Sequence, residues 1–256
     1  MRWLAAAALF AILIAGCTTT RPSAALQPIP AISAASAPAA VAELAARRAS
    51  FAGARAFVRI RATTRDRIRS FNAQIAVDSA GRMLLIAYTP IGTQAIRIYS
   101  EGERVLFVSD IQHAAWSGAT AEFGHSFGFF GPSPSLSPIA FLLLGLPADG
   151  HVTGAQEIIC TAGMAGCAPG TRLTRFASRD GAITYIATAG GLASAAFGTG
   201  SAVTFDPPGY PPAKVSIIRG DQRLDVTYRE IGTTTEPIAP LEVPKGYRES
   251  GVPGLP

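Results

Sequence analysis

Alternating apolar and polar residues run through much of the chain and predict a series of short β-strands. In residues 71–78 every second side chain is apolar, from Phe71 through Ile75, which is the period of a strand with one buried face. Glycine-containing turns separate several such segments, so the pattern favours an antiparallel meander over a parallel sheet. Strands are expected over residues 56–61, 71–78, 82–89, 94–100, 104–109, 172–177, 183–187, 203–205, 214–219 and 223–230.

Residues 82–89 differ from the other predicted strands because they are apolar on both faces. The sequence there is Arg-Met-Leu-Leu-Ile-Ala-Tyr-Thr, with Leu85 near its centre. A sheet with one solvated face needs apolar residues on one side only. An apolar cavity within the fold would use this excess.

Two segments have apolar residues at helical spacing. Residues 41–51 predict a short first helix. Residues 139–144 follow a proline and precede Gly-Leu-Pro, and these are typical boundaries of a short buried helix. The alternative is that this run serves only as ordinary core. Its apolar residues include Ile139, Phe141, Leu142 and, just beyond its end, Leu146.

Beyond the N-terminal segment, composition divides the chain into three parts. Residues 18–40 are rich in Ala, Ser, Pro and Thr, which is typical of a flexible tether. The hydrophobic content of 48% allows a substantial core in one domain over residues 41–232. Residues 233–256 are rich in proline and predict an extended strap or tail.

The N-terminus resembles a bacterial lipoprotein signal. Arg2 precedes an apolar run over residues 3–14, which is shorter than the roughly 20 residues that a membrane span needs. Ile14-Ala15-Gly16-Cys17 has the form of a lipobox. Residues 1–16 are then removed and Cys17 carries lipid. The alternatives are an ordinary secretory signal with an incidental cysteine and, less favoured because residues 18–22 are polar, a membrane anchor.

Positive charge is concentrated in one stretch of the sequence. The formal net charge is +5, and Asp66 is the only acid among the arginines of residues 55–69. Such a cluster attracts anionic lipid headgroups or an acidic protein, whereas an exported protein rarely meets nucleic acid. The alternative is a solvated strand face. The arginines of this region are Arg47, Arg48, Arg55, Arg59, Arg61, Arg65, Arg67 and Arg69.

Cys160 and Cys167 enclose a loop of small residues. In an oxidising compartment this spacing favours a disulfide. A metal site would need further ligands, and His113, His125 and His151 have no companion at metal-binding spacing. No metal or cofactor is therefore expected.

One motif offers an enzymatic alternative. Residues 124–128 read Gly-His-Ser-Phe-Gly, which matches the nucleophile elbow of lipases and esterases around Ser126. The only later histidine is His151, and the only acid between them is Asp149. Hydrolase folds separate their triad residues by whole βα units, so the sequence favours a non-enzymatic protein.

Two further motifs carry a family resemblance. Residues 85–96 form a predicted strand–turn–strand with Pro90-Ile91-Gly92 at the turn, and residues 141–147 end in Leu-Gly-Leu-Pro. Behind a lipobox, these resemble the LolA/LolB family of lipoprotein carriers, and most closely its outer-membrane members. The resemblance covers about residues 45–230. It implies an α+β fold, mainly antiparallel β, in which helices cover the concave side of a half-open barrel.

The resemblance also implies a function. The cavity would bind acyl chains of lipoproteins or lipids, received from a LolA-like periplasmic carrier, and the protruding turn would deliver them to the outer membrane. Thr18, rather than Asp, after Cys17 implies anchoring at that membrane, facing the periplasm. The alternative is a scaffold lipoprotein that binds a protein partner in envelope assembly. The residues implied for the cavity and its lid are Phe71, Ile75, Leu85, Ile139, Phe141, Leu142 and Leu146.

Overall fold

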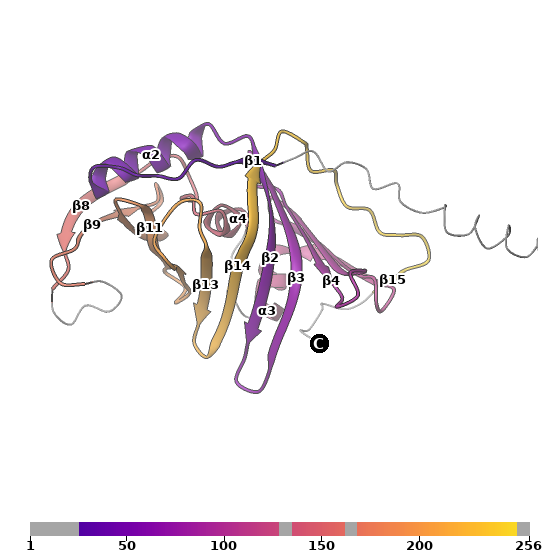
Figure 1. Ribbon diagram of the computed structural model, residues 1–256. Coiled ribbons are helices and arrows are strands. Elements are labelled where there is room, and N and C mark those ends of the chain that lie inside the picture. Colours follow the sequence, from indigo (N-terminus) through magenta and orange to yellow (C-terminus); the bar gives the residue numbers. More distant parts are fainter. Residues whose placement is uncertain (1–25, 128–134, 162–167, 250–256) are drawn as a thin grey trace, which may run out of the picture.

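The computed structural model describes residues 26–127, 135–161 and 168–249, and these build one large β-sheet with three helices (Figure 1). The helices are α2 (Ala37–Ala49), α3 (Thr120–Phe127) and α4 (Ser137–Leu143). The strands are β1 (Gln27–Pro28), β2 (Gly53–Thr63), β3 (Ile68–Asp78), β4 (Met83–Tyr88), β5 (Gln94–Glu101), β6 (Arg104–Ser109), β7 (Ala114–Ala119), β8 (Thr153–Ile159), β9 (Arg172–Ala177), β10 (Ile183–Thr188), β11 (Gly191–Phe197), β12 (Ala202–Phe205), β13 (Lys214–Arg219), β14 (Gln222–Thr233) and β15 (Arg248–Glu249).

Two antiparallel meanders form the sheet. One contains β2 to β7 and the other β8 to β14, and the pairing of β2 with β14 joins them at the centre. The short β1 also pairs with β14, and β15 pairs in parallel with β7. The sheet stays open, because β8 and the β7–β15 pair stand at opposite ends of the strand order.

The helices lie on the inner side of this curved sheet. α2 contacts β8 to β11, and α4 lies within the curve (Figure 1). The strands alternate as their sequences predict: along β2, Val58 and Ile60 are buried, whereas Arg59 and Arg61 are exposed. The predicted α+β half-open barrel with helices on its concave side is confirmed.

α4 is the centre of the main hydrophobic core. Phe141 is fully buried, and its ring meets the edge of Phe51 with centroids 5.6 Å apart. The Tyr228 hydroxyl on β14 donates a hydrogen bond to the carbonyl oxygen of Leu143. Gly81, in the turn between β3 and β4, has a φ of +79°, and a Cβ there would lie 2.0 Å from Ser137 Oγ. Close packing therefore fixes the helix against both halves of the sheet.

The segment before α2 is part of the domain. The Ile32 amide donates to the Tyr210 carbonyl at 3.1 Å, and the Ala34 amide donates to the Ala189 carbonyl at 3.2 Å. Ile32 itself is buried. The structure thus differs from the predicted tether of residues 17–40 over residues 26–40, because a few isoleucines within this Ala- and Pro-rich stretch supply apolar contacts. α2 also begins at Ala37 rather than at residue 41.

Residues 234–249, which we call the C-terminal strap, lie on the outer face of the first meander. Ile238 is buried with Ala76 and Tyr99, and Leu84, Leu106 and Leu241 pack around them. The Glu236 carboxylate pairs with Arg55 at 2.7 Å, and the Tyr247 hydroxyl donates to Asp110 at 2.9 Å. The strap explains the strand that is apolar on both faces: Leu85 of β4 packs against the main core and Leu84 against the strap.

Candidate functional site

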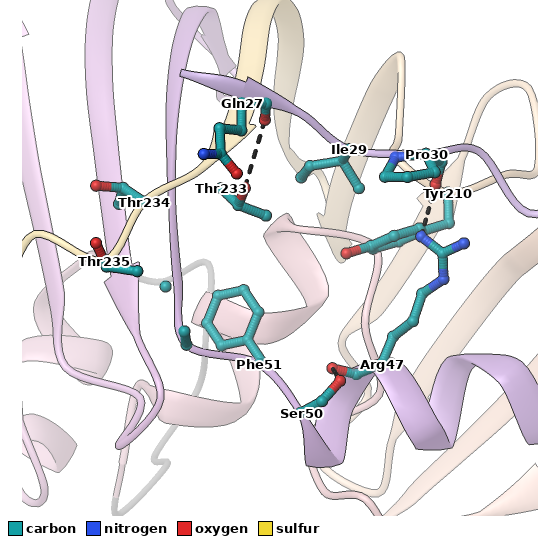
Figure 2. A pocket seen from close by; sticks show the side chains of 12 residues that line it. Gln27, Ile29, Pro30, Arg47, Ser50, Phe51, Tyr210, Thr233, Thr234 and Thr235 are labelled. Carbon is teal, nitrogen blue, oxygen red and sulfur yellow. Dashed lines mark hydrogen bonds between the residues drawn. The ribbon is translucent and has the colours of Figure 1, made fainter. Parts of the chain in front are cut away.

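A cavity of about 390 Å³ opens beside the core, where four segments distant in sequence meet (Figure 2). These segments are the β1 region, the end of α2 with the start of β2, the loop between β12 and β13 that contains Tyr210, and the end of β14 with the start of the strap. Its volume lies within the range of about 300–1,000 Å³ that is usual for ligand pockets. The lining residues are Gln27, Ile29, Pro30, Arg47, Ser50, Phe51, Ala52, Gly53, Tyr210, Thr233, Thr234 and Thr235.

Apolar groups form much of the cavity wall. Ile29, Pro30 and the Tyr210 ring line it together with Phe51 (Figure 2). Phe51 also contacts Phe141 of α4, so this wall is continuous with the main core. Burial raises the pKa of the Tyr210 hydroxyl, whereas the charge of the nearby Arg47 acts to lower it. The cavity is therefore suited to hydrocarbon.

Arg47 brings a positive charge to the cavity. Its guanidinium donates to the Pro30 carbonyl at 2.6 Å and to the Glu43 carboxylate at 3.0 Å through Nε. It also lies 5.0 Å from the centroid of the Tyr210 ring. These contacts hold the arginine at one side of the apolar wall, where it can meet the polar end of a bound amphiphile.

The threonines of residues 233–235 supply hydroxyl groups on the side where the strap begins. The Thr233 hydroxyl donates to the Gln27 carbonyl at 3.5 Å (Figure 2). The strap crosses so close to β2 that a Cβ on Gly53 would lie 2.8 Å from the Thr234 carbonyl oxygen. A larger residue at this glycine would push the strap away from the cavity.

Arg48 lies beside this site and covers the core. Its guanidinium carbon is 3.4 Å from the centroid of the Phe141 ring, and Nε donates to the Ala148 carbonyl at 3.3 Å. Burial lowers the pKa of this arginine, while the charge of Asp149 opposes the shift. Arg47 and Arg48, neighbours at the end of α2, therefore contact different aromatic rings.

The predicted delivery turn protrudes from the sheet between β4 and β5. Ile91 is 86% exposed, and Gly92 has a φ of +86° with open space around it. The Thr89 amide donates to the Thr93 carbonyl at 2.8 Å, and the two threonine hydroxyls lie 2.7 Å apart. These bonds hold the turn and present the isoleucine to solvent.

The residues predicted for the cavity and lid lie in one packed core. Ile75, Ile139, Phe141, Leu142 and Leu146 are buried, and the partly buried Phe71 and Leu85 pack against them. The cavity described above lies to one side, with Phe51 between it and α4. The sequence therefore identified the core that supports the cavity rather than the residues that line it.

The esterase-like motif does not have the surroundings of a nucleophile elbow. Its residues 124–127 lie inside α3, after an antiparallel strand, and residue 128 is outside the described part. Asp149 accepts a hydrogen bond from the His151 backbone amide at 3.0 Å, which closes a local turn. A nucleophile elbow instead needs a sharp strand-to-helix turn within an α/β fold.

Cys160 is disulfide-bonded and buried. Its predicted partner, Cys167, lies outside the described residues, as does the predicted lipidation site, Cys17. Within the described ranges, no group of three His, Cys, Asp or Glu side chains is arranged to hold a metal ion. Nor is any helix in them both long and apolar enough to cross a membrane.

Comparison with known proteins gives resemblances in structure alone. No protein-family model matches the sequence, and no curated protein matches it. A LolA superfamily protein from Nitrosomonas europaea has a TM-score of 0.48 at 10% identity, with 80% of this chain and 96% of that chain covered. A DUF1329 family protein from Desulfovibrio piger has a TM-score of 0.47 at 8% identity, covering 76% and 92% respectively. Lipoprotein LppX from Mycobacterium tuberculosis has a TM-score of 0.30 at 14% identity, covering 79% and 98%.

Proposed function

We propose that this protein is a non-enzymatic lipid-handling lipoprotein, similar in role to the outer-membrane carriers of the LolA/LolB family. The observation that carries the proposal is the cavity at Phe51, where apolar walls meet a fixed arginine. An acyl chain would lie against Ile29, Pro30 and Phe51, and its polar end would face Arg47 and the threonines. Burial of hydrocarbon stabilises such a complex by about 0.8 kcal/mol per methylene, so no cofactor is needed.

In this proposal Cys17 carries the lipid anchor and the protein faces the periplasm from the outer membrane. A LolA-like periplasmic carrier supplies the acylated cargo. The turn containing Ile91 then contacts the bilayer during release. The exposure of this isoleucine on a hydrogen-bonded turn supports that role, because an apolar side chain held away from the fold can enter the lipid interface.

Filling the cavity tests where the acyl chain binds. Replacing Thr235 by tryptophan places a large ring at the cavity wall, whereas Ala239→Trp changes an exposed strap residue that does not line it. We expect Thr235→Trp to weaken binding of a fluorescent fatty acid by about tenfold, the loss of roughly two buried methylenes. The control should bind as the unchanged protein does. Equal binding by both variants would place the acyl chain elsewhere.

Changing the delivery turn tests transfer separately from binding. Ile91→Glu should reduce transfer of a lipidated peptide from the protein to vesicles by about tenfold, because desolvating a carboxylate at the lipid interface costs free energy. Binding of the peptide should be unchanged. Ile159→Glu is the matched control, since this isoleucine is also exposed but lies on β8. Loss of transfer in both variants would show that the effect is general charge repulsion.

A scaffold that binds a protein partner is the second candidate. The packed surroundings of α4 favour it, since side chains fill the space where a larger cavity was expected. Failure of the purified protein to bind any acyl probe, together with unchanged behaviour of Ile91→Glu, would support the scaffold over the carrier.

A further inference from the structure

The outer face of the sheet holds a second concavity, which we call the basic groove. It has a volume of about 560 Å³ and lies over β2, β3, β13 and β14, away from the C-terminal strap. Three of its side chains are cationic and one is acidic. The lining residues are Arg59, Arg61, Ile68, Ser70, Lys214, Asp225 and Thr227.

Strand register places the two groove arginines on adjacent rows of the outer face. Arg59 lies between Thr227 of β14 and Asn72 of β3, and Arg61 lies between Asp225 and Ser70. Both arginines are exposed. In the described part of the chain neither forms an ion pair, so their charges are directed to solvent.

The groove's acid is already engaged by other groups. Asp225 accepts a hydrogen bond from the Ser216 hydroxyl at 2.5 Å and from Arg223 Nε at 2.9 Å, and Lys214 Nζ lies 3.8 Å away. These interactions lower the pKa of the carboxyl group, whereas its burial opposes them. The acid is thus ionised and neutralised locally, and the groove keeps the positive charge of Arg59 and Arg61.

The positive surface continues onto the turn between β2 and β3 and the start of β3. Arg65 and Arg67 are exposed in the turn with Asp66, and Arg69 is exposed in β3. Arg65 Nε lies 3.5 Å from an Asp221 carboxylate oxygen. Among these arginines stands Ile68, which is 60% exposed and also lines the groove.

Two more exposed isoleucines lie at the same end of the first meander. Because its strands are antiparallel, every second turn falls at one end of the sheet, and these are the turns after β2, β4 and β6. The turn after β4 carries Ile91, and the turn after β6 carries Ile111, which is 66% exposed. One end of the sheet therefore combines exposed arginines with three exposed isoleucines, of which one begins β3 and two lie on turns.

We propose that the basic groove and this end of the sheet bind the surface of an anionic phospholipid membrane. The arginines match lipid phosphates in charge and can donate two hydrogen bonds to each, and the isoleucines match the apolar layer beneath. An acidic protein segment would explain the arginines but leave the three exposed isoleucines without a role. The proposal does not depend on acyl binding at Phe51, since it involves different residues.

Vesicle sedimentation tests this surface. The chain is used from Thr18 onward, which removes the predicted lipid anchor and keeps the sheet and core, both of which begin after residue 26. It should bind phosphatidylcholine vesicles that contain phosphatidylglycerol more tightly than pure phosphatidylcholine vesicles, and added salt should reduce the difference.

Paired variants locate the binding. Arg59→Gln combined with Arg61→Gln should lower affinity for the anionic vesicles by about tenfold, since each surface cation contributes substantially. Arg172→Gln combined with Arg175→Gln removes the same charge from exposed positions on β9 and should have little effect. Equal losses in both pairs would mean that only net charge matters, which overturns the proposal. Preference for a polyglutamate peptide over both vesicle types would overturn it in favour of an acidic protein partner.

Acyl binding provides an independent readout. The Arg59/Arg61 double variant should take up the fluorescent fatty acid as the unchanged protein does, because the basic groove lies on the face opposite the core. Normal uptake with lost vesicle binding supports the groove alone. Lost uptake in this variant would show that the fold has changed. In that case Ile68→Ser is the deciding variant, because it leaves the charges in place. Its vesicle binding shows whether the isoleucine contributes.

Discussion

Phe141→Ala should lower the free energy of unfolding by about 3–5 kcal/mol, the usual range for removing a buried phenylalanine. The side chain is fully buried, contacts Phe51 edge-on and lies under the Arg48 guanidinium. Its loss leaves a cavity where α4 contacts both Phe51 of the cavity wall and Gly81 of the β3–β4 turn. Urea unfolding followed by circular dichroism measures the change.

The control for this substitution is Ile159→Ala on the exposed surface of β8. Surface changes of this kind usually alter stability by no more than about 0.5 kcal/mol. A loss below about 1 kcal/mol for Phe141→Ala would contradict a tightly packed α4. So small a loss would instead support an open cavity beneath this helix.

Ile238→Asp should detach the C-terminal strap and reduce stability by about 2–4 kcal/mol, because it places an unpaired charge among apolar side chains. Ile238 is 5% exposed and packs with Ala76 and Tyr99 on the outer face of the sheet. Lys245 lies further along the strap. Tryptic cleavage there should become faster, which mass spectrometry detects directly.

Val243→Asp provides the comparison within the same strap, since Val243 is 47% exposed. We expect its stability and cleavage to remain close to those of the unchanged protein. If both substitutions release the strap equally, its attachment depends on overall charge rather than on the buried isoleucine. If neither does, the main-chain pairing of β15 with β7 is sufficient.

Strong periodicity explains which elements the sequence could predict. β3, β6, β9 and β13 combine β-branched or aromatic residues with alternation, and α4 has Pro138 in its first turn, as helix starts often do. The sequence predicts no strand at β11, because this segment consists largely of Gly, Ala and Ser, yet Leu192 and Ala195 are fully buried in it. Its neighbours in the sheet, rather than its own propensity, place it in a strand.

The candidate site was predictable only where it is local in sequence. The exposed turn at Ile91 consists of five consecutive residues, and its glycine and proline identify it directly. The cavity instead joins Ile29, Arg47, Tyr210 and Thr235, which only the folded sheet brings together. Proline-rich composition predicts that the strap is extended, but it does not show that a few apolar residues such as Ile238 attach it to the sheet.

The central pairing of β2 with β14 determines when this protein can complete its fold. Synthesis produces β2 early and β14 late, so Val58 cannot pair with Tyr228, its partner across the two strands, until most of the chain has been made. Contacts between residues so far apart in sequence form slowly, because the chain must close a long loop first. Until then β2 pairs only with β3 and is an edge strand, so its other side is open to pairing with other chains. A chaperone that protects this edge during synthesis or export would therefore act on the half-finished sheet, before the cavity at Phe51 exists.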